Sequence, residues 1–319
     1  MVVPSPMTHA SRLIAVVLAA LACAAAAPPP DPEGQVVTEL VVRAPDGGPA
    51  WWKVTSGAST VWVLGVPDAL PKGLKWDDAV LDRRLNNASR VILPSTAHIG
   101  ILDLFSALSL GGKLQSKTPF EASLPPDVAT RFTAAAAALH QTPAHYDRWK
   151  PAIAGLLMVS DFRKQAGLEA NQPLDAMKAA AGRHHLRAAP AISYPAMPML
   201  KSLVGELSDT VNVACLADAL QEIEAGPTRV RSAAQAWAVG DVAGALTAER
   251  GFERCLAALP NGADLTRRTE ADQADAIAAA LKTPGIVVAV VELRPLLASG
   301  GVLDHLRAQG FAVRPPGAE

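Results

Sequence analysis

The chain has few of the residues that thiolate metal clusters and nucleic-acid surfaces need. It has only three cysteines in 319 residues and no Cys-x-x-Cys pair, which argues against a cysteine-based metal site. Lysine and arginine total 29 against 30 acidic residues, so the formal net charge is −1. Without a basic excess there is no field to attract a polyanion. We therefore expect no nucleic-acid partner.

Two common catalytic signatures are also missing. Gly111-Gly112-Lys113 is followed by Leu114 and not by Ser or Thr, so it does not match a phosphate-binding loop. Ser95 and His98 lie close together in the sequence, but Ser95 is not inside a Gly-x-Ser-x-Gly turn. These absences argue against a phosphate-loop nucleotidase and against a serine hydrolase of the elbow type.

The N-terminal part of the sequence has the pattern of a targeting segment. Arg12 precedes an apolar run of about ten residues at 13–22, which is too short to span a bilayer stably. Small residues and three prolines follow, so we predict a signal peptide over 1–27 and an exported protein, periplasmic or extracellular. Cys23 is placed where a lipid-modified cysteine could lie. A membrane-anchored lipoprotein is therefore the alternative.

Two cysteines, Cys215 and Cys255, remain in the mature chain, both inside predicted helices. In an exported protein two cysteines usually pair, and we predict a disulfide between them. Two buried free thiols are the alternative.

Strand patterns occur at both ends of the mature chain and helical patterns fill the middle. We expect a proline-rich linker and possible edge strand at 28–49, then a single domain at 50–319. A hairpin is predicted from Trp51–Thr55 and Thr60–Leu64, with further buried strands at Arg90–Leu93 and Ile286–Val291. The prediction is a mixed α/β (α+β) fold whose central sheet combines N- and C-terminal segments around a helix-rich middle.

Five segments carry a resemblance to a known family. They are WWKVTSGASTVWVLG, RVIL, CLADAL, AWAVGD and GGVLDHLRAQGFAV, and they follow one another over roughly 50–315. In this order they resemble the TraB/GumN family, a Tiki-like metalloprotease superfamily, with the chain as a divergent member. The resemblance implies a site of two Gly-x-x-His loops, a Glu after the second buried strand and an Arg-Asn pair. Such residues hold a divalent metal ion that acidifies a bound water.

The chain departs from that pattern at each position. The first loop begins at Gly65 and has Asp68 where the resemblance implies His. Pro94 takes the place of the Glu and Pro295 that of the second His. The Arg-Asn pair falls at Arg268 and Thr269, so Thr stands where Asn is implied. Proline has no side-chain ligand atom. The resemblance therefore implies a retained fold, a lost metal site, no cofactor and a non-catalytic binding or structural role for an unidentified partner.

One catalytic alternative stays open. Asp68, His98 and Glu292 could together form a divergent metal-dependent peptidase site, with Asp68 as a ligand of a divalent ion. The competing interpretation of Glu292 is a structural ion pair with Arg294 or Arg268. The two interpretations differ in whether Glu292, His98 and Asp68 meet in one pocket.

Overall fold

The computed structural model describes residues 31–45, 47–98, 111–169, 172–203 and 207–318. These residues belong to one compact unit that starts at Asp31. The predicted signal peptide at 1–27 and Cys23 lie outside the described residues. Within the described part, no helix is both long and apolar enough to cross a membrane.

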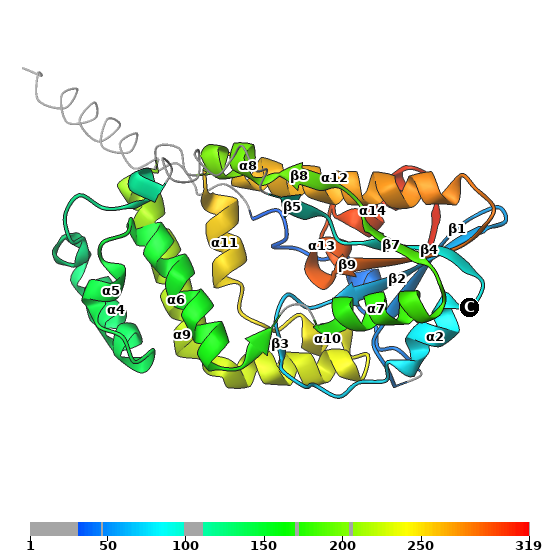
Figure 1. Ribbon diagram of the computed structural model, residues 1–319, viewed down its shortest axis with the longest axis horizontal. Helices are drawn as coiled ribbons and strands as arrows, with labels where there is room; N and C mark the ends of the chain where they lie inside the picture. Colours follow the sequence, from blue (N-terminus) through cyan, green and yellow to red (C-terminus); the bar gives the residue numbers. More distant parts are fainter. Residues whose placement is uncertain (1–30, 46, 99–110, 170–171, 204–206, 319) are drawn as a thin grey trace, which may run out of the picture. The chain divides into compact units, whose positions relative to one another are not determined.

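A six-stranded mixed sheet joins the two ends of the sequence (Figure 1). Its order is β10 (Ala312–Arg314), β1 (Trp51–Ser56), β2 (Ser59–Val66), β9 (Gly285–Glu292), β4 (Ala88–Leu93) and β7 (Arg187–Pro190). The four strands β2, β9, β4 and β7 are parallel, whereas β1 is antiparallel to both β2 and β10. The predicted mixed α/β fold, with its sheet built from both ends of the chain, is confirmed.

The central strands are apolar because both of their faces are covered. In Figure 1, α12 (Gly262–Leu281) and α14 (Val302–Ala308) lie on one side of the sheet, and α2 (Ala79–Leu85) and α7 (Gln172–Arg183) lie on the other. All four helices contribute buried side chains to the same core as β2 and β9. Parallel strands between two helical layers typically have continuous runs of Val, Ile and Leu.

A close approach explains Gly65 near the end of β2. A Cβ atom there would lie 2.6 Å from Leu293 and 3.0 Å from the Trp52 ring. The Gly65 carbonyl accepts a 2.7 Å hydrogen bond from Nε1 of buried Trp237. Two segments of the family resemblance, VWVLG and AWAVGD, therefore pack directly on each other.

A second, helical core lies beside the sheet. It contains α4 (Pro126–Ala138), α5 (Pro143–Tyr146), α6 (Pro151–Gln165) and α9 (Asp209–Ala238), packed around side chains such as Phe132, Met158 and Leu216. The Ser208 hydroxyl caps α9 by accepting from the Val211 N–H at 3.3 Å. The helix kinks at Gly226, whose φ is 72°, just before Pro227.

Shorter elements complete the fold. They are η1 (Thr38–Leu40), β3 (Leu70–Pro71) with β6 (Leu168–Glu169), β5 (Thr96–His98) with β8 (Ser193–Pro195), η2 (Glu121–Ser123), α8 (Ala196–Leu203), α10 (Val242–Ala245), α11 (Gly251–Ala258) and α13 (Leu293–Leu297).

The predicted disulfide is present. It joins Cys215 of α9 to Cys255 of α11, with the two Cα atoms 4.6 Å apart. The pair lies in a small apolar cluster with Ala152 and Leu259. Because α11 is a short helix, this bond fixes its position against α9, and with it the side chains of α11 that face the sheet.

The stretch expected to be a linker with a possible edge strand is packed on the domain from Asp31 onward. Its described residues form the short helix η1 and two isolated β-bridges, Val36 with Ala298 and Arg43 with Asp241, instead of a continuous strand. The Val37 N–H donates to the Leu297 carbonyl at 2.8 Å, and the Ala44 N–H donates to the Gly240 carbonyl at 2.8 Å. Leu40 is fully buried and its carbonyl accepts from Trp52 Nε1 at 3.2 Å. The apolar residues that resembled a strand therefore anchor this segment to the domain.

The last long helix, α12, begins at Gly262 directly after α11. A Cβ atom at Gly262 would overlap the Leu256 carbonyl oxygen at 1.9 Å, so only glycine permits this tight turn between α11 and α12. This start puts Thr266 and Glu270 on the same helix.

Candidate functional site

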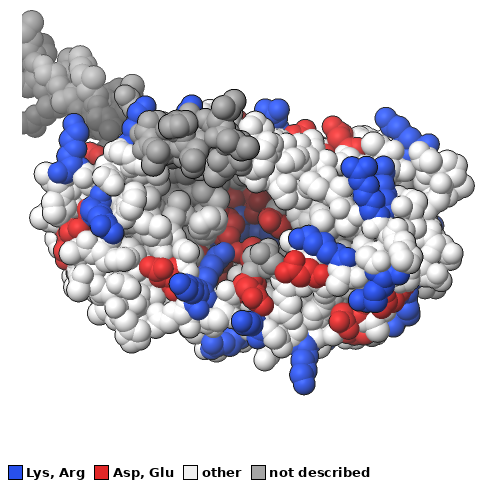
Figure 2. Space-filling view, in the orientation of Figure 1, with Lys and Arg blue, Asp and Glu red and all other residues white. Residues whose placement is uncertain are grey.

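A cavity of about 480 Å³ opens at the carboxyl ends of the parallel strands β2, β9 and β4. This edge of a parallel sheet is where α/β proteins commonly bind ligands, and the volume lies in the usual range for small molecules. Residues of α6, α11, α12, α13, α14, β5, β8 and the segment at 31–33 form the remaining walls. Figure 2 shows acidic side chains gathered in a hollow near the middle of this face.

The three altered family positions line this one cavity. Asp68 follows β2, Pro94 follows β4, and Pro295 lies in α13 directly after β9. They are far apart in the sequence and meet because neighbouring parallel strands end at the same edge of the sheet. The structure therefore brings together the positions that the resemblance assigns to a single site.

Asp68 is held by an arginine from α6. Arg163 Nη2 lies 3.2 Å from Asp68 Oδ2, 2.8 Å from Glu222 Oε1 and 3.7 Å from Glu253 Oε1. Burial opposes the charge of Arg163, but the three carboxylates outweigh it, so the pKa of Arg163 is raised. A permanent cation of the protein therefore occupies one side of Asp68.

Two glutamates beside Asp68 hold protons unusually tightly. Burial, followed by the charge of Asp68, raises the pKa of Glu253 to about 9, with Arg163 acting in the opposite direction. Burial, followed by the charges of Asp68 and Glu33, raises the pKa of Glu292 to about 7. At neutral pH Glu253 therefore holds its proton beside Asp68.

Glu292 faces the cavity without a partner among the described residues. It is accessible to solvent from the cavity although protein surrounds it on most sides. The predicted ion pair with Arg294 or Arg268 is wrong. Arg294 donates to the backbone carbonyls of Leu246 at 2.6 Å and Glu33 at 3.4 Å. Arg268 is exposed and lies 3.7 Å from Asp272, four residues along α12.

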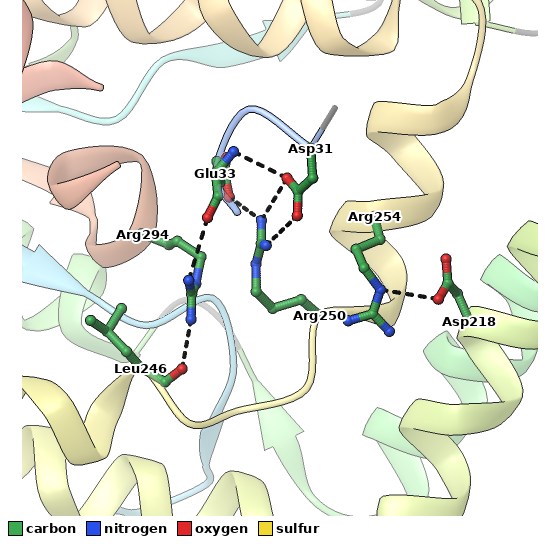
Figure 3. A network of polar contacts seen from close by, with 7 residues as sticks. All are labelled: Asp31, Glu33, Asp218, Leu246, Arg250, Arg254 and Arg294. Atoms are coloured by element: carbon green, nitrogen blue, oxygen red, sulfur yellow. Dashed lines mark hydrogen bonds and ion pairs between the residues drawn. The ribbon is translucent and has the colours of Figure 1, made fainter. Parts of the chain in front are cut away.

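The N-terminal segment closes one side of the cavity through a polar network (Figure 3). Arg250 donates to Asp31 at 2.5 and 3.2 Å and to Glu33 at 2.9 Å. In the same view, Arg254 of α11 pairs with Asp218 of α9 at 3.0 Å. Asp31 and Glu33 were not expected here, because the sequence pattern assigns them to the linker.

Glu270 of α12 has the smallest solvent-exposed fraction of the carboxyl groups that line the cavity. Its residue is 3% exposed, and it makes no hydrogen bond or ion pair with the described part of the chain. Burial, followed by the charge of Glu33, raises the pKa of Glu270 to about 8, while Arg267 opposes the shift. The helical pattern contains a signal for it, since Glu270 lies four residues before buried Ala274 and shares its face.

Unsatisfied polar atoms concentrate around the cavity. Within the described ranges, six buried side-chain nitrogen or oxygen atoms lack a hydrogen-bond partner, and four of them belong to residues lining the cavity. These four are Asp68 Oδ2, Arg250 Nε, Glu253 Oε2 and Glu270 Oε1, of which Asp68 Oδ2 still has the Arg163 guanidinium 3.2 Å away. Native proteins satisfy nearly all buried polar groups with protein or water partners, so the remaining atoms are available to water or to a bound molecule in the cavity.

Comparison with known proteins agrees with this arrangement. The family model for the TraB/PrgY/gumN family matches residues 50–315. The chain belongs to the TraB/PrgY/gumN family. No curated protein and no solved structure matches the chain. The resemblance found in the sequence is therefore confirmed at the level of the family.

The metal ion implied by this TraB/PrgY/gumN membership does not fit the residues present. Pro94 and Pro295 offer no side-chain ligand, and Asp68 already faces Arg163. His98 is an exposed residue of β5 whose Nδ1 lies 2.9 Å from Ser193 Oγ, and it does not line the cavity. Among the described residues, no group of three His, Cys, Asp or Glu is arranged to hold a metal ion.

The three residues of the catalytic alternative are therefore only partly together. Asp68 and Glu292 share the cavity and influence each other electrostatically, but His98 is outside it. Sequence reasoning missed Arg163, Glu253 and Glu270, which reach the cavity from three different helices.

Proposed function

We propose that this protein is an exported member of the TraB/PrgY/gumN family that has lost the metal-dependent hydrolase site and acts by binding a ligand in the cavity. The observation that carries the proposal is the contact of Arg163 with Asp68, flanked by Pro94 and Pro295. A guanidinium keeps its charge at every accessible pH. It therefore supplies permanently the positive charge that a metal ion would bring to Asp68.

Moving Arg163 aside would carry a large cost. Its Nε and Nη2 also donate to Glu222 Oε1 at 3.0 and 2.8 Å, and the Glu222 side chain is only 2% exposed. A metal ion binding at Asp68 would have to displace Arg163 or accept its repulsion, and displacement would leave Glu222 buried and unpaired. This supports a site without a metal ion and without metal-activated water.

The unsatisfied atoms around the cavity support a binding role. A purely structural pocket has no reason to keep several buried carboxyl oxygens without partners. The alternative, a divergent metal-dependent peptidase using Asp68, His98 and Glu292, lacks a histidine in the cavity lining.

Export is part of the proposal. The predicted signal peptide at 1–27 directs the chain to the periplasm or the exterior, and the Cys215–Cys255 disulfide supports such an oxidising compartment. Lipid attachment at Cys23 would hold the same domain at a membrane surface.

Elemental analysis of the secreted protein tests the loss of the metal site. We expect substoichiometric metal, unchanged in Asp68→Ala and in the control Asp175→Ala, whose exposed carboxylate lies on α7 away from the cavity. We also expect no cleavage of unstructured peptides after addition of Mn²⁺, Co²⁺ or Zn²⁺. One equivalent of metal that is lost only in Asp68→Ala, together with metal-dependent cleavage, would favour the peptidase alternative.

A further inference from the structure

We propose that the cavity binds a small linear organic dication, a diamine or polyamine, whose two ammonium groups reach two sets of carboxyl groups. This inference rests on the binding function proposed above and names its ligand class. It follows from the acidic lining, from one buried group without a partner, and from the apolar side chains in the same lining.

The described cavity lining is strongly acidic. It contains six carboxyl groups, Asp31, Glu33, Asp68, Glu253, Glu270 and Glu292, against the two guanidinium groups of Arg163 and Arg250. Both arginines are already engaged, Arg163 with Asp68 and Glu222 and Arg250 with the segment at 31–33. The lining therefore has acceptor capacity left over, and a bound cation would favour the ionised forms of Glu253 and Glu270, which burial keeps protonated.

The acidic groups form two sets that share Glu33 as a neighbour. Asp68 acts on both Glu253 and Glu292 at the strand ends, whereas Glu270 on α12 responds to Glu33 and Asp31, and Glu33 also acts on Glu292. Asp68 does not perturb the pKa of Glu270, although both residues line the same cavity. A molecule with two cationic ends can therefore pair with Asp68 and its neighbours at one end and with Glu270 at the other.

Glu270 supplies the independent evidence for a ligand. It is 97% buried, since 3% of it is exposed, and its Oε1 has no partner among the described residues. Without a partner Glu270 holds its proton at neutral pH, because burial raises its pKa to about 8, and an ammonium group beside it would favour the ionised form. An ammonium group offers three N–H donors on a narrow stem, which suits an oxygen at the bottom of a cavity.

Part of the cavity lining is apolar. Phe252, Leu256, Pro295 and Val302 line the cavity together with the acids. Methylene groups between two ammonium ions would bury against these side chains, as the stems of lysine side chains do. A hydrated divalent ion would gain nothing from this surface, and no three acidic groups of the described chain are grouped to ligate one. A peptide with two lysine side chains carries similar charged ends, so competition with such a peptide belongs to the test.

Titration calorimetry on the secreted protein tests this inference. The probes are 1,4-diaminobutane, 1,5-diaminopentane and spermidine, with n-butylamine as the matched monoamine, at constant pH and salt. We expect saturable binding of one diamine per chain and binding of n-butylamine that is weaker by about tenfold or more. Glu270→Gln is expected to weaken diamine binding by at least about tenfold, because it removes one charged end of the site.

Two further variants separate binding from folding. Glu292→Gln changes an accessible group of the other acidic set and is expected to weaken diamine binding without a change in fold. Glu39→Gln makes the same chemical change at an exposed position outside the cavity and is expected to bind like the parent. Circular dichroism and an unfolding curve for each variant show whether it is folded.

The inference is overturned if no diamine binds, if n-butylamine binds equally well, or if folded Glu270→Gln and Glu292→Gln both bind like the parent. Tighter binding of Mn²⁺ or of a Lys-Lys peptide in competition with the diamine would also overturn it. If the protein holds no metal, cleaves no peptide and binds no diamine, only the proposed ligand class is wrong. Stoichiometric metal with peptide cleavage defeats the proposed function itself.

Discussion

Replacement of Arg163 by methionine is expected to lower the free energy of unfolding by about 3–5 kcal/mol, the usual cost of removing one member of a buried ion pair. Methionine retains the apolar stem and removes the charge. Glu222, with 2% of its side chain exposed, would then keep only the Phe252 N–H, at 3.2 Å, as a hydrogen-bond donor among the described residues. Asp68 and Glu253 would lose the cation between them. Urea unfolding at neutral pH measures the loss.

Arg131→Met is the matched control. Arg131 of α4 forms a similar two-nitrogen contact with Glu224, also on α9, but both side chains are at the surface, 33% and 45% exposed. A pair of this kind contributes up to about 1 kcal/mol. Equal losses in the two variants would contradict the buried role of Arg163. Adding Glu222→Gln to Arg163→Met is expected to restore part of the stability, because it removes the unpaired charge.

The edge of the sheet that carries the cavity follows from the sequence pattern. Val61–Leu64, Arg90–Leu93 and Ile286–Val291 are short apolar runs, and such runs become neighbouring parallel strands in mixed α/β folds. Once these strands lie side by side, the residues that follow them must meet at one edge. The convergence of Asp68, Pro94 and Pro295 was therefore accessible without coordinates.

The side chains that contact these positions could not be predicted from the sequence in the same way. Arg163 lies in the last turn of α6, where a basic residue is ordinary because it favours the helix dipole. Nothing local indicates that it reaches Asp68, since that contact depends on how α6 packs beside the sheet. Asp31 and Glu33 were misassigned because a proline-rich stretch resembles a linker, although its backbone pairs with the domain.

The role of Glu270 could be predicted from the sequence in part. Helical periodicity places it on the buried face of α12 together with Gln273, which lies four residues before Ile277. Gln273 finds a partner there, accepting from the Ser95 N–H at 3.1 Å, whereas Glu270 has none in the described chain. An acidic residue on an apolar stripe is thus visible in the sequence, but its lack of a partner is visible only in three dimensions.

The same group leads to an expected pH dependence of stability. Burial raises the pKa of Glu270 to about 8 in the folded protein, whereas an unfolded glutamate titrates near its ordinary value of 4.5. Below about pH 4.5 Glu270 is protonated in both the folded and the unfolded protein, so it does not lower the free energy of unfolding. As pH rises from there to about 8, the unfolded chain releases the proton first. Stability therefore falls over this window and levels off above it.

Glu270→Gln is expected to remove this loss. Glutamine keeps the shape and carries no charge, so the variant and the parent should be similar in stability at pH 5. At pH 8 the variant should be more stable by about 2 kcal/mol, after allowance for water that reaches the cavity. Urea unfolding at several pH values between 5 and 9, without added amine, measures the difference.

Glu39→Gln provides the reference for this series, because Glu39 is exposed and lies outside the cavity. Its stability should run parallel to that of the parent at every pH. Glu253 and Glu292 also have raised pKa values, about 9 and 7. Part of the parent's loss of stability toward alkaline pH should therefore come from these two groups and remain in Glu270→Gln.

A constant difference in stability between Glu270→Gln and the parent from pH 5 to 9 would contradict the raised pKa of Glu270. A difference that grows with pH and shrinks when a diamine is added would connect the unpaired carboxyl group to the proposed ligand, because the ammonium group stabilises the ionised form.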